Sequence, residues 1–195
     1  MEQVIDIYKR TGDFMECVYQ TGLPAFRIHI ILAKSGLLKI SDKIKYGSKA
    51  QILGGKAEEY FQKLIPEALD ANRYIRKNNP GFDYVYKDMT IDVKWASVAK
   101  KRKGTGQKEK GHESWDIRAS GGQDITVAFL ERTAMAGVNK PYILVIPNGF
   151  IHVKGTMTIT PKGEIFRGCI VTESELINVL NAYAEVFHKE KGSDV

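Results

Sequence analysis

The chain has 195 residues, of which 43% are hydrophobic, 10% aromatic and 27% charged. These proportions are those of a globular protein and exclude a disordered, collagen-like or mucin-like chain. No apolar run approaches the ~18 residues of a membrane span, and the N-terminus lacks the basic start and apolar run of a signal peptide. The only cysteines, Cys17 and Cys169, are far apart, which argues against a disulfide framework or a cysteine zinc site. We therefore expect a soluble, cytoplasmic protein.

The formal net charge is +6, and positive charge gathers in one segment of the chain. That segment contains Lys100, Lys101, Arg102, Lys103, Lys108 and Lys110, with Glu109 as its single acid. Gly104 and Gly106 interrupt it and Gly111 follows it, so the sequence predicts a loop rather than a helix face. Such a loop either binds the phosphates of a nucleic acid or is only a solvated surface, and the composition leaves both interpretations open.

The first 46 residues are predicted to form helices. The apolar spacing at residues 4–8 indicates a first amphipathic helix, and Asp13 can cap a second. Pro24 suits the first turn of a third helix, and Gly36 is a suitable residue at its end.

Two short segments then separate this region from the rest of the chain. Residues 37–40 are predicted to be a small extended wing, and the glycines within residues 47–55 indicate a linker. Residues 56–69 return to helical spacing, with their apolar side chains on one stripe.

The remainder is predicted to contain several strands and a closing helix. The predicted strands cover residues 82–86, 89–96, 115–119, 125–130 and 142–147. Residues 173–189 have the spacing of an amphipathic helix. This order of helix, strands and helix favours a mixed α/β core.

A two-residue turn at Lys87-Asp88 would bring three charged side chains together. Opposing residue numbers of the hairpin would then sum to 175, so Asp83 would face Asp92 with Cβ atoms about 5 Å apart. Lys94 would point to the same face as Asp92 because it is two residues further along the strand. Two opposed carboxylates repel unless a cation lies between them, and such oxygen ligands suit Mg²⁺. The lysine could orient a water molecule or stabilise charge on a phosphate.

This arrangement resembles the PD-(D/E)xK superfamily of nucleases, which share the restriction-endonuclease-like fold. Asp83 matches the first aspartate of the family motif, Asp92 its second acid, and Lys94 its lysine. Pro80 departs from the motif because it stands three residues before Asp83 rather than next to it. The resemblance covers roughly residues 54 to 150 and implies a mixed β-sheet core flanked by helices.

The family usually adds a glutamate from the preceding helix. Glu58 matches it better than Glu59, because Glu58 precedes an apolar helix residue by three. The resemblance implies that Glu58, Asp83 and Asp92 bind Mg²⁺, for which Mn²⁺ can substitute. It also implies that Lys94 positions the attacking water.

Three further polar residues lie near the predicted strands, namely Gln123, Asp124 and Glu131. Asp124 and Glu131 are predicted to be solvated residues at strand ends. The alternative that Gln123 and Asp124 reach the site stays open.

The N-terminal segment resembles a helix-turn-helix, with Gly22 at its turn. The resemblance implies DNA-binding side chains on the third helix, namely Arg27, His29 and Lys34. Phe26 and Ile30 on the same helix are apolar, which leaves a protein contact open as an alternative. An ordinary helical hairpin packed on the main domain is another.

These observations predict three parts: a helix-turn-helix-like module at 1–46, a linker at 47–55 and a nuclease-like domain at 56–195. The scattered histidines and the lack of a Walker or GxGxxG motif argue against a histidine-bound metal and a nucleotide cofactor. We expect a Mg²⁺-dependent DNA endonuclease that acts as a homodimer. A non-catalytic DNA-binding regulator and a junction-resolving nuclease are the alternatives.

Overall fold

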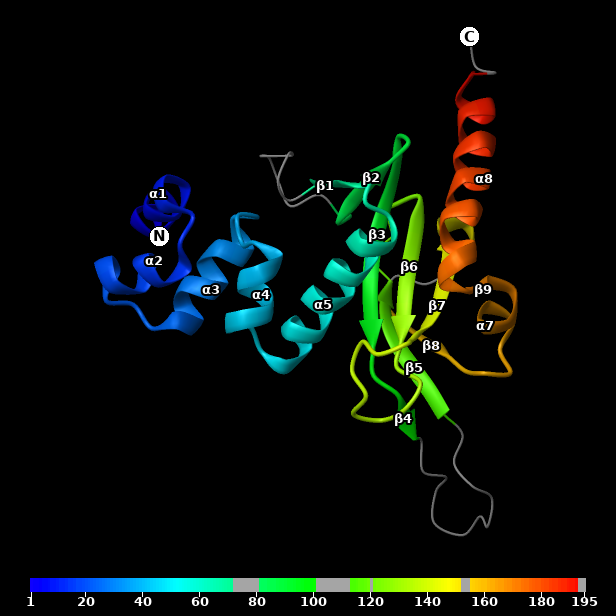
Figure 1. Ribbon diagram of the computed structural model, residues 1–195, viewed down its shortest axis with the longest axis horizontal. Coiled ribbons are helices and arrows are strands. Elements are labelled where there is room, and N and C mark those ends of the chain that lie inside the picture. Colours follow the sequence, from blue (N-terminus) through cyan, green and yellow to red (C-terminus); the bar gives the residue numbers. More distant parts are fainter. Residues whose placement is uncertain (72–80, 101–112, 120, 152–154, 193–195) are drawn as a thin grey trace.

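The structure, a computed structural model, describes residues 1–71, 81–100, 113–119, 121–151 and 155–192. It shows an α/β protein in which N-terminal helices precede a mixed sheet with flanking helices (Figure 1). The helices are α1 (Glu2–Thr11), α2 (Phe14–Thr21), α3 (Ala25–Lys34), α4 (Ile40–Tyr46), α5 (Lys49–Leu64), α7 (Glu164–Cys169) and α8 (Glu173–Gly192), with a 3₁₀ turn at Asn148–Phe150. No helix within these ranges is long and apolar enough to cross a lipid bilayer.

The strands form two sheets. They are β1 (Leu69–Asp70), β2 (Tyr84–Tyr86), β3 (Met89–Ala96), β4 (Ala99–Lys100), β5 (Glu113–Ala119), β6 (Ile125–Leu130), β7 (Tyr142–Pro147), β8 (Gly155–Ile159) and β9 (Ile170–Val171). The larger sheet has the order β1-β2-β3-β6-β7-β9, and the smaller one has the order β4-β5-β8. Only the pair β3–β6 is parallel among the described strand pairs.

The three N-terminal helices form where the sequence predicts them. Gly12 ends α1 with φ 64°, and Gly22 ends α2 with φ 66°, a left-handed conformation that glycine adopts without strain. Asp13 caps α2, because its Oδ1 accepts hydrogen bonds from the backbone N–H groups of Met15 at 2.8 Å and Glu16 at 3.3 Å. The helices enclose a core of their own, made of Val4, Ile7, Tyr8, Phe14, Cys17, Ile28, Leu32 and Leu38.

Two predictions for residues 37–55 are wrong. The segment expected to form an extended wing leads instead into α4, and the expected linker contains the beginning of α5. Ser48 and Gln51 form a capping box at this point: the Ser48 N–H donates to Oε1 of Gln51 at 2.8 Å, and the Gln51 N–H donates to Oγ of Ser48. This cap and the packing of α4 on α5 outweigh the cost of glycines inside the helix, about 1 kcal/mol each. A helix therefore joins the N-terminal module to the sheet, as Figure 1 shows.

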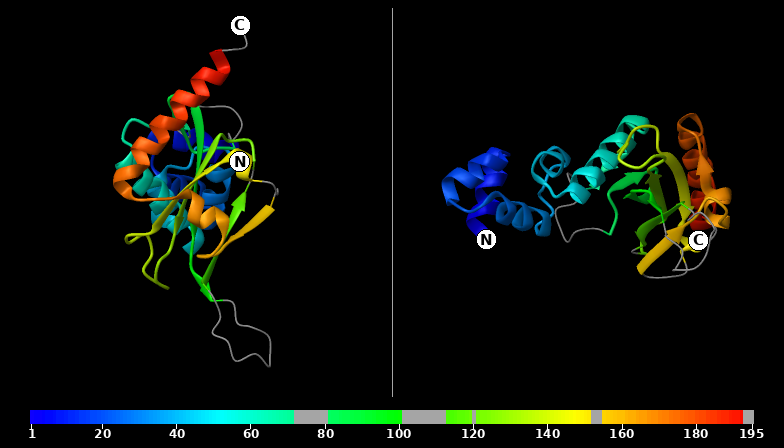
Figure 2. Two further views of the ribbon diagram at one scale, coloured as in Figure 1. Left: turned by 90° about the vertical axis from the view of Figure 1, so that its right-hand side faces the viewer. Right: turned by 90° about the horizontal axis from the view of Figure 1, so that it is seen from below.

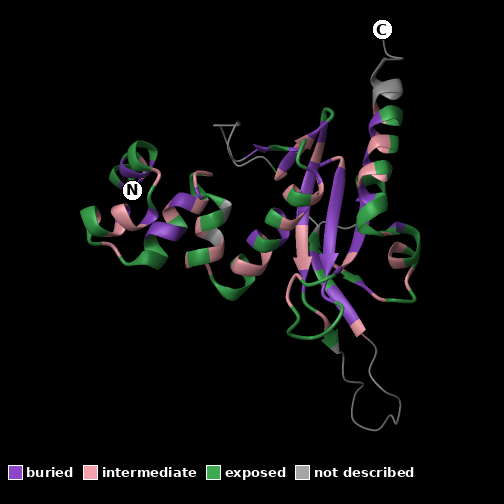
Figure 3. Ribbon diagram, in the orientation of Figure 1, coloured by how far each residue is buried: buried purple, intermediate pink, exposed green. Residues whose placement is uncertain are grey.

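The faces of the larger sheet are covered by different layers. Odd-numbered residues of β3, β6 and β7 pack with side chains of α5 and α8, such as Phe61 and Leu180. Even-numbered residues of the same strands pack with β5, β8 and α7, through side chains such as Trp115 and Phe166. Every residue of β6 is buried as a result (Figure 3). Burial on both sides explains why the β6 sequence is a nearly continuous apolar run.

The N-terminal helices and the sheet occupy different parts of the molecule, and most strands of the sheet form where the sequence predicts them. The N-terminal helices stand to one side of the sheet, and α8, which packs on one of its faces, lies at the opposite end of the molecule (Figure 2). The strands predicted at 89–96, 125–130 and 142–147 have the bounds that the sequence indicated. The predicted hairpin strand at 82–86 is shorter, because it begins at Tyr84.

Candidate functional site

The hairpin of β2 and β3 has the predicted register. Tyr84 pairs with Ile91, Val85 with Thr90, and Tyr86 with Met89, so paired numbers sum to 175. The intervening residues, Lys87 and Asp88, have φ angles of 47° and 62°. Positive φ at both positions is what a two-residue hairpin turn of type I′ requires.

Asp83 stands where this ladder ends, next to Asp92. Its backbone N–H donates to the carbonyl oxygen of Ile91 at 2.9 Å, so it does not continue the regular pairing. Its side chain replaces a backbone acceptor, because Oδ2 of Asp83 accepts the N–H of Val93 at 2.9 Å. This bond to β3 fixes the carboxylate of Asp83 beside that of Asp92.

Lys94 completes the predicted group on the same face of β3. Its Nζ lies 2.7 Å from Oδ1 of Asp92, in a hydrogen-bonded ion pair. The lysine side chain is 28% exposed, whereas that of Asp92 is 4% exposed. The pair therefore runs from the interior to the surface, with its positive end outermost. We name Asp83, Asp92 and Lys94 the aspartate–lysine cluster.

Burial of the Asp92 carboxylate raises its pKa to about 6. The positive charge of Lys94 opposes this rise, and the negative charge of Asp83 adds to it. A pKa near 6 leaves Asp92 mainly ionised at neutral pH, yet easily protonated in mild acid. An acid that is buried beside both a cation and a second carboxylate is typical of a functional site.

Thr126, which the sequence reasoning did not single out, lies beside Asp92, and Gln123, for which a place near the site was left open, binds Thr126. Thr126 of β6 is the neighbour of Asp92 in the parallel pair of strands, and both point to the even-numbered face. Nε2 of Gln123 donates to Oγ1 of Thr126 at 2.8 Å, and each of these residues is 1% exposed. The signal in the sequence was Thr126 itself, because it is a polar residue inside the otherwise apolar run of β6.

The two other acids near the strands hold the backbone together. Oδ2 of Asp124 accepts the backbone N–H and the hydroxyl of Thr90, both at 2.7 Å, and so fastens β3 to the start of β6. Glu131 is only 4% exposed, and it accepts the N–H groups of Val98 and Gly137, each at 3.1 Å. The prediction that Glu131 is a solvated strand-end residue is therefore wrong.

Glu58 belongs to the other side of the sheet. It is 8% exposed on α5, and its carbonyl oxygen accepts the hydroxyl of Tyr84 at 2.9 Å. Tyr84 pairs with Ile91 and so shares the face that α5 covers, whereas Asp92 points to the opposite face. Across the described ranges, no three side chains of His, Cys, Asp or Glu gather closely enough to hold a metal ion. The expected three-carboxylate group of Glu58, Asp83 and Asp92 is thus not assembled in this structure.

The two aspartates alone still fit the chemistry of Mg²⁺. This ion binds through one or two carboxylates and completes its coordination with water and phosphate oxygens. Asp83 and Asp92 provide adjacent carboxylates, and a cation between them would relieve their repulsion. Glu59, the other candidate on α5, points into solvent, where its carboxylate lies 4.0 Å from Nζ of Lys63.

Of the three residues of α3 that were predicted to bind DNA, two are exposed and one is buried. Arg27 and Lys34 are exposed, as predicted. His29 is 4% exposed, and its ring centroid lies 6.5 Å from that of Phe14 inside the module. The prediction that His29 projects toward a DNA groove is therefore wrong, because its helix position faces the core of the module.

Of the basic segment, the structure describes only Lys100. The backbone of Lys100 pairs with Glu113 at the end of β4. Lys101, Arg102 and Lys103 lie outside the described residues. Their contact with phosphates stays a prediction.

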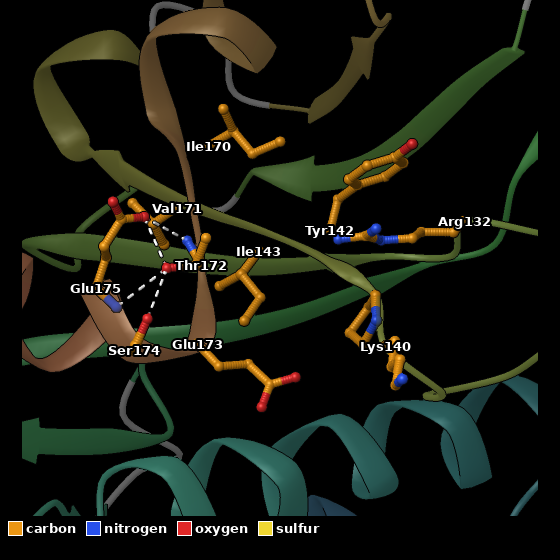
Figure 4. Close-up of a pocket in the computed structure, with 11 residues that line it drawn as sticks. Arg132, Lys140, Tyr142, Ile143, Ile170, Val171, Thr172, Glu173, Ser174 and Glu175 are labelled. Atoms are coloured by element: carbon orange, nitrogen blue, oxygen red, sulfur yellow. Dashed lines mark hydrogen bonds between the residues drawn. The ribbon is translucent and has the colours of Figure 1, made fainter.

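A pocket of about 580 Å³ lies at the other edge of the sheet, between β7, β9 and the start of α8 (Figure 4). Its polar groups largely bind one another: Glu175 accepts the N–H and the hydroxyl of Thr172, each at 2.8 Å. Arg132 lies over the ring of Tyr142, at 4.4 Å from the centroid. The pocket is lined by other residues than the aspartate–lysine cluster, so it adds nothing to the candidate site.

Comparisons with protein families, with curated proteins and with solved structures found no match. The functional argument consequently depends on the geometry of the aspartate–lysine cluster and on the surface of the N-terminal helices.

Proposed function

We propose that the protein is a Mg²⁺-dependent DNA endonuclease whose chemistry takes place at the aspartate–lysine cluster. The observation that carries the proposal is the hairpin register, which sets Asp83 beside Asp92 and leaves Lys94 paired with Asp92 at 2.7 Å. Two adjacent carboxylates can hold a divalent ion, and a lysine beside them can orient water or stabilise charge on a phosphate, which are functions that metal-assisted hydrolysis of a phosphodiester uses.

Each residue of the cluster has a separate role in this proposal. Asp83 and Asp92 bind the ion, which supplies positive charge to the phosphodiester and acidifies a water molecule. Lys94 holds the attacking water, or stabilises the developing negative charge on the phosphate. Its partly exposed ammonium group can exchange its contact with Asp92 for one with the substrate. Thr126, whose hydroxyl accepts a hydrogen bond from Gln123, places a polar residue beside Asp92.

The remaining parts of the proposal concern DNA. Arg27 and Lys34 of α3 contact the duplex, and the basic segment beginning at Lys100 binds phosphates. The protein acts as a homodimer, since a two-fold symmetric pair can cut both strands of a duplex at equivalent positions.

A second candidate is a DNA-binding regulator without catalytic activity. The observation that favours it is the separation of Glu58 from the two aspartates in the described part of the chain. In that case the aspartate–lysine cluster would serve only as an ion pair. A junction-resolving nuclease would use the same cluster and differ in substrate alone.

A nicking assay separates these candidates. Supercoiled plasmid and a four-way DNA junction are each incubated with the full chain, with Mg²⁺, with Mn²⁺ and with excess EDTA. Nicking of the plasmid that requires a divalent ion supports the endonuclease, and a strong preference for the junction supports the resolving enzyme. DNA binding without cleavage of either substrate would reject the nuclease and leave the regulator.

A further inference from the structure

One face of α3 combines exposed apolar side chains with positive charge. Phe26 is 63% exposed and Ile30 is 47% exposed. Both have large apolar side chains of a kind that is usually buried. With 3.6 residues per turn, Phe26, Arg27, Ile30 and Lys34 fall within an arc of about 100°. The other side of the helix packs into the module through Ile28, His29 and Leu32.

The charge of this face has one sign. Between Glu16 and Asp42 the chain contains no acidic residue, while Arg27 and Lys34 lie on the exposed arc. A partner with negative charge beside an apolar surface would complement it. The major groove of a duplex has this character, because phosphates border it and the C5-methyl group of thymine is an apolar group on its floor.

We propose that α3 reads thymine methyl groups in the major groove of a DNA duplex, with Phe26 and Ile30 as the residues that contact them. The proposal deepens the DNA-binding part of the proposed function and depends on it. Arg27 and Lys34, which lie together at one edge of this arc, hold the helix against the phosphates along one side of the groove.

Helix geometry indicates how the thymines are spaced. Phe26 and Ile30 are four residues apart, which corresponds to about 6 Å along the helix axis. Successive base pairs are about 3.4 Å apart along a strand. When α3 lies along the groove, the two side chains therefore meet bases about two steps apart, so the preferred site contains at least two closely spaced thymines.

A second copy of this chain suits the face less well. In a two-fold symmetric dimer the same patch meets itself, so Arg27 and Lys34 of one protomer would approach the same cations of its partner. No acidic residue of the stretch between Glu16 and Asp42 would compensate them. Like charges brought together at an interface oppose association.

The test compares thymine with deoxyuridine, which lacks only the methyl group. Duplexes that bind the full chain are first selected from a random library in EDTA, so that no cleavage takes place. Each thymine of the selected site is then replaced singly by deoxyuridine, and the dissociation constant is measured. Replacement at a contacted position should weaken binding about fourfold, which is the effect of burying one methyl group.

Variants assign the effect to the proposed side chains. Phe26→Ser and Ile30→Ser should each abolish the thymine preference at one position while retaining most of the salt-dependent affinity. Phe150→Ser is the matched control, because Phe150 is 52% exposed but lies outside the N-terminal module. The control should discriminate thymine from deoxyuridine as the wild type does.

Several outcomes would overturn the proposal. These are selection without any preferred sequence, equal affinity for thymine and deoxyuridine, or a preference that survives both α3 substitutions. Dissociation of a dimer by Phe26→Ser in sedimentation experiments would identify the face as a self-interface instead. Failure to bind any duplex would reject the DNA-binding part of the proposed function as well, whereas nicking activity is measured separately and does not depend on the methyl preference.

Discussion

Lys94 and Asp92 form an ion pair across the boundary between the interior and the solvent, with Nζ and Oδ1 2.7 Å apart. The carboxylate is almost wholly buried beside a second acid, Asp83, and its pKa stands at about 6. Lys94 limits the cost of this burial, because its charge favours the ionised form of Asp92. The relationship makes each of the three residues testable by a different measurement.

Lys94→Ala should reduce nicking by at least about 100-fold, since it removes a group that acts on the water or the phosphate. DNA affinity should change little, whereas the free energy of unfolding should fall at neutral pH, because the buried carboxylate of Asp92 loses its counter-charge; nicking is therefore compared under conditions in which the variant is folded. Lys63→Ala is the matched control: it removes an equally charged side chain from α5, where Lys63 is paired loosely with Glu59 at 4.0 Å. Nicking by Lys94→Ala at the rate of the control would reject the catalytic role of the cluster.

Asp83→Asn should weaken the binding of Mg²⁺ and Ca²⁺ in the presence of DNA, as measured by calorimetry. The amide oxygen can still accept the N–H of Val93, so the hairpin should persist. In wild-type protein Ca²⁺ should bind but support little cleavage, because its larger and looser coordination shell places the attacking water poorly. Equal metal binding by wild type and variant would remove Asp83 from the site.

Asp92→Asn should change how stability depends on pH in EDTA. The pKa of Asp92 is raised from 3.8 to about 6 in the folded protein, so the folded state holds this proton more tightly than the unfolded chain. The resulting cost is absent below about pH 4, grows between about pH 4 and 6, and is constant above that range. Because asparagine cannot ionise, the free energy of unfolding of the variant relative to wild type should rise across that range, by on the order of 2 kcal/mol.

Denaturation at several pH values checks this expectation. Asp116→Asn serves as the control, because Asp116 is exposed on β5. If the free energy of unfolding of Asp92→Asn differs from that of wild type by the same amount from pH 4 to pH 8, burial does not raise the pKa of Asp92.

The basic segment should determine how strongly DNA binding depends on salt. Each phosphate contact contributes about 0.9 to the slope of log affinity against log salt concentration on duplex DNA. Replacing Lys100, Lys101, Arg102 and Lys103 by Ala should therefore flatten the slope by roughly 2 to 4, with little change in sequence preference. An unchanged slope would show that the segment is a solvated loop.

The sequence by itself determined the local parts of this protein. The turn at Lys87-Asp88 and the alternation on either side of it predicted the hairpin register, because a two-residue turn leaves one pairing that keeps the apolar residues on one face. The helix boundaries at Gly12, Asp13 and Gly22 were predictable for the same reason: capping depends on residues a few positions apart.

Only the tertiary structure decided which distant segments pack against each face of a helix or strand. Glu58 lies on a helix that covers the odd-numbered face of β3, so it is separated from Asp92 although both were predicted for one site. Thr126 lies beside Asp92 because of a parallel strand pair that no local pattern specifies, and His29 is buried because its side of α3 faces Phe14 of α2. Periodicity reveals that a helix or strand has two faces, but the distant segments that pack on each face settle which side chains stay exposed and which come together.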